Sequence, residues 1–459
     1  MPSETFDIVI LGAGSGGYAC ALRAAQLGLT VALVEKDKLG GTCLHRGCIP
    51  TKAMLHSAEV ADAARGGAAY GVNSSLESID LAGVHRYKDG VVGRLYKGLQ
   101  GLVKSATAIT FVEGEGRLSS PTTVTVGDRE LVGKHIVLAS GSYARTLPGV
   151  QIGGRVMTSD EALTLEDVPA RTIVLGGGVI GVEFASVLRS FGSEVTIVEA
   201  LDRLVAAEEP AVSKQLERAF RKRKITTKLG ARVASVSQSD DTVTLTLESG
   251  DTLEAELLLV AVGRGPRTEG LGYEEAGLTL DRGFVTTDER LRTGVGTVRA
   301  VGDIVPGPQL AHRGFAHGIF VAEDIAGLDP TPIDDTLIPK VTYCDPEIAS
   351  VGLSEEQARA KHGDAVTTYE FNLGGNGKSQ ILGTAGFVKL VRSGPDGPVV
   401  GVHMVGARMG EQIGEAQLIV SWEALPEEVA ALIHAHPTQN EALGEAHLAL
   451  AGKPLHAHA

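Results

Sequence analysis

Two stretches of the chain share one pattern of hydrophobic and polar positions. Each begins with a short apolar run without polar alternation, which is typical of a strand buried on both faces of a parallel sheet. A glycine turn, a helix-like stretch and a second apolar run follow. The predicted strand, helix and strand are 8–11, 18–27 and 30–34 in the first copy, and 173–175, 182–191 and 194–198 in the second. The copies align without a gap at an offset of 164, which predicts two strand–helix–strand units.

Both turns carry the spacing G-x-G-x-x-G, and an acidic residue follows 18 positions after the last glycine. The equivalent positions are Gly12, Gly14, Gly17 and Glu35 in the first copy and Gly176, Gly178, Gly181 and Glu199 in the second. Between a strand and a helix, such glycines permit a tight turn and bring backbone close to a pyrophosphate at the helix N-terminus. The acidic residue accepts hydrogen bonds from the ribose hydroxyls of the dinucleotide. The sequence therefore predicts two bound dinucleotides. Glu199 would repel a 2′-phosphate, so NAD is expected at the second site, although Arg203 lies close in sequence.

A pair of cysteines, Cys43 and Cys48, lies in the segment GGTCLHRGCIPTK. A zinc site would need two more ligands at workable spacing, and Cys20 and Cys344 form no second pair, so no metal is predicted. Pro50 suits the first turn of a helix that runs to about residue 64. A cysteine at such a helix start has its thiolate stabilised by the helix dipole. The segment therefore suits a reversible disulfide.

Composition narrows the class of protein. A chain of 459 residues is long enough for about three domains. Its net charge of −14 argues against nucleic-acid binding, and no apolar run approaches the length of a membrane span. Four cysteines are too few for a secreted disulfide scaffold, and the first residues lack a basic leader. We expect a cytoplasmic protein. Glycine, at 59 residues, is in excess, as repeated turns against bound ligands would require.

The cysteine segment resembles the redox-disulfide segment of the pyridine nucleotide–disulfide oxidoreductases, and the likeness extends over essentially the whole chain. Further motifs resemble that family in its own order: ASGS at 139–142, the second glycine motif at 176–183, VGRGP at 262–266, AVGD at 300–303 and HAHPTQNE at 434–441. Within the family, the set is most similar to the branch that oxidises dihydrolipoamide for 2-oxoacid dehydrogenase complexes.

The resemblance implies one FAD per subunit, NAD+ as hydride acceptor, and a division of labour between the two sulfurs. Cys43 would exchange with the substrate, and Cys48 would pass electrons to the flavin. Lys52 would lie near the flavin and pair with Glu183. The implied FAD-binding residues are Gly12, Gly14, Gly17, Glu35, Lys52, Ser140, Gly141, Ser142, Asp303 and Ala311. The implied NAD-binding residues are Gly176, Gly178, Gly181, Glu199 and Gly263.

A base is also required, because only a thiolate attacks a disulfide. His436 is the natural candidate, with Glu441 to orient it and stabilise its charged form. By resemblance this histidine reaches the active site of a second subunit, which implies a homodimer. The implied partners are the lipoyl domains of 2-oxoacid dehydrogenase acyltransferases, with the glycine-cleavage lipoyl protein as a further candidate. His434 is expected to be structural.

The motif order predicts an α/β fold with two Rossmann-like domains and an α+β dimerisation domain. The expected boundaries are 1–147 for FAD, 148–270 for NAD, 271–340 for a segment completing the FAD site and 341–459 for the interface domain. In the last domain, 386–391 and 401–405 read as antiparallel strands, and 411–422 as a helix packed on them.

Two alternatives remain at this stage. One is an NAD(P)H-dependent reductase of another low-molecular-weight disulfide, which Glu199 disfavours. The other is a non-catalytic nucleotide-binding scaffold, which would lack a thiol or the base. Mercuric and large thioredoxin reductases need a C-terminal cysteine pair, and no cysteine follows Cys344. His45 and Arg46 depart from the family pattern, and Arg46 is expected at the surface rather than beside a thiolate.

Overall fold

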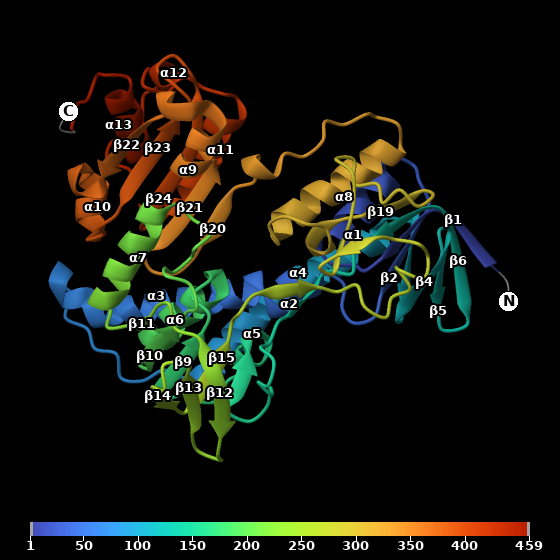
Figure 1. Cartoon of the computed structure of the whole chain (residues 1–459), viewed down its shortest axis with the longest axis horizontal. Coiled ribbons are helices and arrows are strands. Elements are labelled where there is room, and N and C mark those ends of the chain that lie inside the picture. The colour runs from blue at the N-terminus through green and yellow to red at the C-terminus, as the bar shows by residue number, and fades with distance from the viewer. Residues whose placement is uncertain (1–2, 457–459) are drawn as a thin grey trace.

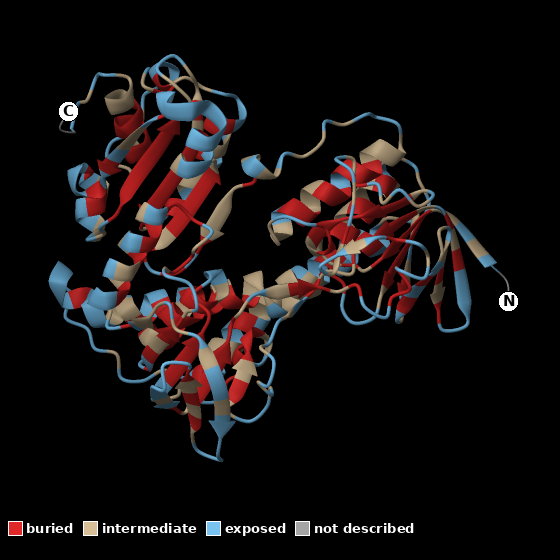
Figure 2. Cartoon of the chain, viewed as in Figure 1, coloured by how far each residue is buried: buried red, intermediate tan, exposed pale blue. Residues whose placement is uncertain are grey.

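The computed structural model describes residues 3–456, and Figure 1 shows them arranged in three lobes. The chain starts in one lobe, crosses to a second, returns to the first and ends in the third. The buried residues lie mainly on the sheets and the helix faces against them (Figure 2). No helix among the described residues is long and apolar enough to cross a membrane.

The first lobe is built on a seven-stranded sheet in the order β3-β2-β1-β6-β5-β4, with β19 paired to β6. Its strands are β1 (Ser3–Leu11), β2 (Val31–Glu35), β3 (Ile109–Glu113), β4 (Gly116–Ser120), β5 (Thr123–Val126), β6 (Arg129–Leu138) and β19 (Val298–Ala300). Strands β3, β2, β1, β6 and β19 are parallel, and β4 and β5 pair antiparallel with their neighbours. Helices α1 (Ser15–Gln26) and α8 (Ala311–Ile325) pack on each other over this sheet.

Helices between the first two lobes carry the cysteines. They are α2 (Gly41–Arg46), α3 (Cys48–Gly66), η1 (Gly67–Tyr70) and α4 (Leu81–Ser105). In Figure 1, α2 and α4 lie between the two lobes, and α3 extends from there along the second lobe. Because α3 also packs against a helix of the second lobe, α6 (Val179–Phe191), the cysteines lie where the two dinucleotide units meet.

The second lobe has a parallel five-stranded sheet in the order β11-β10-β9-β15-β8. Its elements are β8 (Val156–Thr158), α5 (Ser159–Ala162), β9 (Arg171–Leu175), β10 (Glu194–Val198), α7 (Pro210–Lys222), β11 (Thr226–Lys228) and β15 (Leu257–Val260). An antiparallel meander lies beside it, formed by β12 (Val233–Gln238), β13 (Val243–Leu247) and β14 (Thr252–Ala255). The two passages between the lobes pair as a ribbon of β7 (Ser142–Ala144) and β16 (Arg264–Pro266).

After this ribbon the chain returns to the first lobe and then crosses to the third. The return segment holds β17 (Leu280–Asp281), β18 (Phe284–Val285), η2 (Gly302–Ile304) and η3 (Asp335–Leu337). The third lobe has an antiparallel sheet in the order β20-β21-β24-β23-β22. Its strands are β20 (Lys340–Thr342), β21 (Glu347–Gly352), β22 (Thr367–Asn372), β23 (Phe387–Arg392) and β24 (Val399–Gly406). Its helices are α9 (Glu355–His362), η4 (Gly363–Ala365), η5 (Leu373–Gly375), α10 (Gly377–Leu382), α11 (Met409–Ser421), α12 (Pro426–Val429) and α13 (Glu441–Leu450).

The predicted fold class is confirmed: one mixed, mostly parallel sheet and one parallel sheet precede an α+β lobe. The largest difference concerns β1, which begins at Ser3 rather than at residue 8, because its first residues pair with β6 outside the apolar run. The two strands predicted in the last lobe do pair antiparallel, as β23 and β24. The expected domain boundaries remain predictions.

Candidate active site

The first glycine turn forms a cradle for phosphate. Helix α1 begins after Gly14, and no side chain caps its N-terminus, so its first N–H groups remain free for a ligand. A Cβ on Gly17 would lie 1.8 Å from the carbonyl oxygen of Gly12, so only glycine permits this approach of helix to strand. Glu35, at the end of β2, accepts the backbone N–H of Ala13 at 2.8 Å and of Asp37 at 3.0 Å.

The second turn repeats these contacts at the same offset. Helix α6 begins after Gly178 without a side-chain cap, and a Cβ on Gly181 would lie 1.9 Å from the carbonyl oxygen of Gly176. Glu199 accepts the N–H of Gly177 at 2.6 Å and of Leu201 at 2.8 Å. Because the sequence repeat is also a repeat of hydrogen bonds and steric contacts, both turns have the geometry that a dinucleotide pyrophosphate requires.

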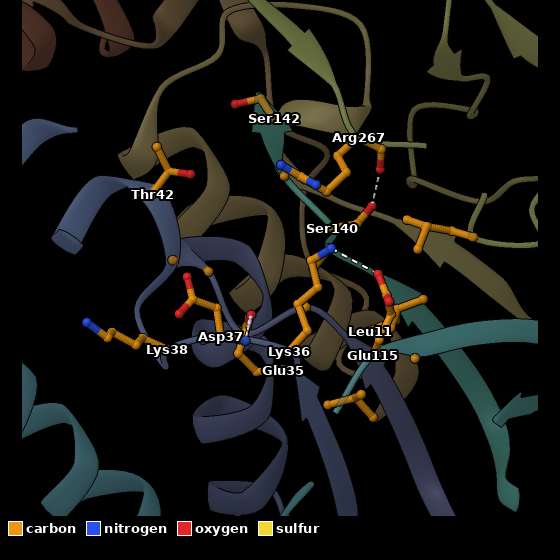
Figure 3. A pocket seen from close by; sticks show the side chains of 18 of the residues that line it. Leu11, Glu35, Lys36, Asp37, Lys38, Thr42, Glu115, Ser140, Ser142 and Arg267 are labelled. Carbon is orange, nitrogen blue, oxygen red and sulfur yellow. Dashed lines mark hydrogen bonds and ion pairs between the residues drawn. The ribbon is translucent and has the colours of Figure 1, made fainter. Parts of the chain in front are cut away.

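A cavity opens over the first turn, and Figure 3 shows its side chains. Of the residues expected to bind FAD, those lining the cavity are Gly12, Gly14, Glu35, Ser140, Gly141 and Ser142. Lys36, Asp37, Lys38, Thr42 and Arg267 also line it and were not predicted. The cationic side chains of Lys36, Lys38 and Arg267 and the uncapped helix N-terminus suit an anionic dinucleotide, so this chain has a site into which FAD fits.

Asp303 and Ala311, two further residues expected at the flavin, come from the return segment. Asp303 lies in η2, and its Oδ2 accepts the hydroxyl of Ser142 at 2.5 Å. Arg264 donates from Nε to that same hydroxyl at 2.8 Å. Ala311 is the first residue of α8, whose N-terminus has no side-chain cap. Neither Asp303 nor Ala311 lines the cavity itself, but Asp303 contacts the lining residue Ser142.

The two cysteines occur as free thiols at the junction of α2 and α3. A hydrogen bond from Cys43 is the largest influence on Cys48, and with the charge of Lys52 it outweighs burial and lowers the pKa of Cys48 to about 7. The same hydrogen bond, together with burial, holds the pKa of Cys43 well above its usual range. Of the two thiols, Cys48 is therefore the one that ionises near neutral pH.

Lys52 and Glu183 form an ion pair between α3 and α6. Lys52 Nζ lies 2.8 Å from Glu183 Oε2, and the Glu183 side chain is only 3% exposed. Burial alone would lower the pKa of Lys52, but the adjacent Glu183 carboxylate raises it, so the ammonium keeps its charge. Tyr343, which was not predicted, donates its backbone N–H to Glu183 at 2.9 Å and places its ring 4.8 Å from Lys52 Nζ.

A second unpredicted aromatic residue, Tyr18 on α1, lies near the thiols. Burial first and the charges of Cys43 and Cys48 next raise the pKa of Tyr18 to about 12, so it stays protonated. Arg46 is half exposed and pairs with Asp37 rather than with a thiolate, in line with the expectation for its position. His45 contacts the carbonyl of Leu39 at 2.9 Å.

The predicted base lies on the third lobe. His436 Nδ1 is 2.7 Å from Glu441 Oε1, and the other oxygen of Glu441 accepts the N–H of Thr438 at 2.7 Å. The His436 side chain is 75% exposed. In one chain the base thus faces solvent, and it belongs to a lobe other than the one that carries the cysteines. Gly263, expected at the NAD site, has a left-handed φ of 100° and accepts the N–H of Arg145.

Two family models cover nearly the whole chain. Residues 6–318 match the pyridine nucleotide-disulphide oxidoreductase model, and residues 338–447 match the dimerisation domain of the same family. Among the described residues, no group of three or more His, Cys, Asp or Glu side chains is arranged to hold a metal ion.

Characterised relatives are similar over their full length. The chain is 42% identical to dihydrolipoyl dehydrogenase of Bacillus subtilis, covering 98% of this chain and 99% of the relative. It is 39% identical to mitochondrial dihydrolipoyl dehydrogenase 1 of Arabidopsis thaliana, covering 99% and 92%. Among solved structures, LpdA of Mycobacterium tuberculosis superposes with a TM-score of 0.90 at 27% identity, covering 96% and 99%. The flavoprotein disulfide reductase RclA of Escherichia coli has a TM-score of 0.86 at 26% identity, covering 96% and 99%. The chain belongs to the pyridine nucleotide-disulphide oxidoreductase family.

Proposed function

We propose that this chain oxidises protein-bound dihydrolipoamide to lipoamide and transfers the electrons through FAD to NAD+. Its family uses FAD and NAD(H) in disulfide oxidoreduction, and the relatives named above are dihydrolipoyl dehydrogenases. The observation that carries the proposal is the pair Cys43 and Cys48, in which one sulfur has a pKa of about 7 beside the Lys52–Glu183 ion pair.

The residues present fit both cofactors. We assign Gly12, Gly14, Gly17, Glu35, Ser140, Gly141, Ser142, Asp303, Ala311 and Lys52 to FAD and Gly176, Gly178, Gly181, Glu199 and Gly263 to NAD. The flavin, when bound, carries the electron pair from the dithiol to the nicotinamide. Uncapped N-termini of α1 and α6 would offer their N–H groups to the two pyrophosphates.

The protein's own groups account for the thiol chemistry. His436 removes a proton from one substrate thiol, and Glu441 orients the imidazole and balances its charge. The substrate thiolate attacks Cys43 Sγ, the Cys43–Cys48 bond breaks, and Cys48 leaves as a thiolate. His436 passes its proton to the departing Cys43 sulfur and takes the proton of the second substrate thiol. The resulting thiolate attacks the substrate sulfur of the mixed disulfide, which closes the lipoyl ring and leaves Cys43 as a thiol. A low pKa makes Cys48 the better leaving group, which supports this order of events.

The family's dimerisation domain is present, so the assembly is a homodimer. We infer that the exposed His436 of each chain serves the cysteines of its partner, since base and thiols occupy different lobes. We further propose lipoyl domains of 2-oxoacid dehydrogenase acyltransferases, or the glycine-cleavage lipoyl protein, as the donors of the dithiol. A catalytic dithiol pair suits a reducing compartment, and we propose a cytoplasmic location.

Exchange of single cysteines tests the proposal. Cys43→Ser and Cys48→Ser should each abolish NAD+-dependent oxidation of dihydrolipoamide while the purified proteins keep wild-type FAD content. Cys20→Ala is the matched control, because Cys20 is fully buried in the first lobe and has its pKa raised to about 12, so its thiol takes no part in exchange. Full turnover by Cys48→Ser would refute the proposed route.

A further inference from the structure

The Glu415 side chain contacts both ends of the loop that carries His436. This base loop, residues 434–440, connects to α13 and has no regular secondary structure. Glu415, on α11, accepts from both ends of it: its Oε1 lies 2.9 Å from His434 Nε2, and its Oε2 accepts the side-chain amide of Asn440. These two partners flank His436, and Asn440 directly precedes Glu441.

The base depends on the position of its loop. The middle of the loop is held from α10 and its N-cap, where Asn376 donates to the Thr438 carbonyl at 3.0 Å and Ser379 donates to the Gln439 side chain at 2.7 Å, so Glu415 is the residue that holds its two ends. The His436 side chain is 75% exposed, so packing does not fix it. Its orientation comes from Glu441, whose second oxygen is in turn held by the N–H of Thr438 within the loop. Any displacement of the loop ends relative to α13 therefore moves the base and its orienting carboxylate relative to each other.

His434 is seated tightly at the start of the loop. Its side chain is 11% exposed, and a Cβ added to Gly444 would lie 2.5 Å from His434 Nδ1, so the ring packs directly on α13 one turn beyond Glu441. The other titratable groups that face this pair are Glu441 and His447, both from α13. The hydrogen bond between them raises the pKa of His434 and lowers that of Glu415, so the contact favours the charged form of each partner.

We propose that Glu415 is a positioning residue of the active site, which fixes the His436–Glu441 pair by binding His434 and Asn440 at once. The inference rests on the proposed function, in which His436 is the base for dithiol oxidation. It assigns His434 a task beyond packing: His434 is the hydrogen-bond partner through which Glu415 holds the start of the loop. Glu415 itself touches neither the substrate nor the thiols.

Substitutions at Glu415 and His434 should affect one of two activities of the FAD-loaded dimer and spare the other. Oxidation of dihydrolipoamide by NAD+ needs the base, whereas reduction of ferricyanide by NADH draws electrons from the flavin without it. Glu415→Ala and His434→Ala should lower kcat for dihydrolipoamide about 100-fold, the cost of a misplaced catalytic group. Ferricyanide reduction, FAD content and KM for NAD+ should stay at wild-type values. His434→Gln keeps a donor for Glu415 and should restore dihydrolipoamide turnover to within about threefold of wild type.

Two controls make the result decisive. Glu411→Ala removes an exposed acid from the same helix and should leave both activities unchanged. His436→Gln should abolish dihydrolipoamide oxidation alone; if it does not, the proposed function loses its base, independently of Glu415. Wild-type dihydrolipoamide turnover by Glu415→Ala would overturn the positioning role. So would a parallel loss of both activities, which would mark a purely structural role, or failure of His434→Gln to rescue.

Discussion

The charge of Lys52 should set the pKa of Cys48, and removing it gives a sharp test of the electrostatics. Cys48 has its pKa lowered from 9.0 to about 7 by the hydrogen bond of Cys43 and the ammonium of Lys52, against burial and the charge of Glu183. In Lys52→Met the favourable charge is lost, while the buried Glu183 carboxylate remains and now acts unopposed. Both changes raise the pKa of Cys48.

The expected rise in the Cys48 pKa follows from the loss of the Lys52 charge. A neighbouring opposite charge commonly shifts a pKa by about 1–3 units, so the Cys48 pKa should rise from about 7 to about 8 or higher. A rise of one unit corresponds to about 1.4 kcal/mol and lowers the thiolate fraction at pH 7 from about one half to about one tenth. Glu183→Gln should act in the opposite direction, because it removes a charge that disfavours the thiolate.

The assay is a pH titration of the reduced protein, following thiolate absorbance and assigning the reacting sulfur by alkylation and peptide mass analysis. Lys52→Met should move the Cys48 midpoint upward, and Glu183→Gln should leave it in place or lower it. The reasoning is refuted if Lys52→Met titrates like wild type, or if both variants move the midpoint upward by the same amount.

Three further changes follow from the structure. Gly17→Ala should yield protein without FAD, whereas Gly181→Ala should keep FAD and lose saturation by NADH, because each added Cβ clashes with a different turn; absorbance spectra and NADH titrations distinguish them. His447 is fully buried with its pKa lowered to about 4, so the unfolded chain binds a proton below pH 6.5 that the folded chain does not, and stability falls from there toward pH 4 by about 3 kcal/mol. The difference in melting temperature between His447→Leu and wild type should therefore shift in favour of the variant when the pH is lowered from 7.5 to 5. The same difference at both pH values would contradict this. Glu199→Ala should lower the preference for NAD+ over NADP+ in kcat/KM, because it removes the carboxylate that repels a 2′-phosphate; an unchanged ratio would contradict this.

Much of the architecture could be predicted because it depends on the spacing of glycine and apolar residues that are close together in the sequence. The glycine turns, for example, impose their geometry within a few residues, and the offset of 164 brings the same hydrogen bonds to Glu35 and Glu199. The start of β1 could not be predicted, because its first residues are held by β6, more than a hundred positions away, and carry no apolar signal.

The same reason explains which site residues were missed. Tyr343 contacts Lys52 and Glu183 only because the third lobe folds back onto α3 and α6, and no spacing in the sequence relates it to them. Glu415 lies in an ordinary amphipathic helix, so nothing local distinguishes it from Glu411. Its two hydrogen bonds to the base loop depend on how α11 and α13 are placed, which only the folded chain determines.

The central claim is the choice of substrate and cofactor, and a single steady-state comparison tests it most directly. The purified FAD protein should be assayed for oxidation of dihydrolipoamide and for reduction of glutathione disulfide, each with NAD(H) and with NADP(H). The account predicts the highest kcat/KM for dihydrolipoamide with NAD+ and its loss in Cys48→Ser. A higher kcat/KM for glutathione disulfide with NADPH would contradict it.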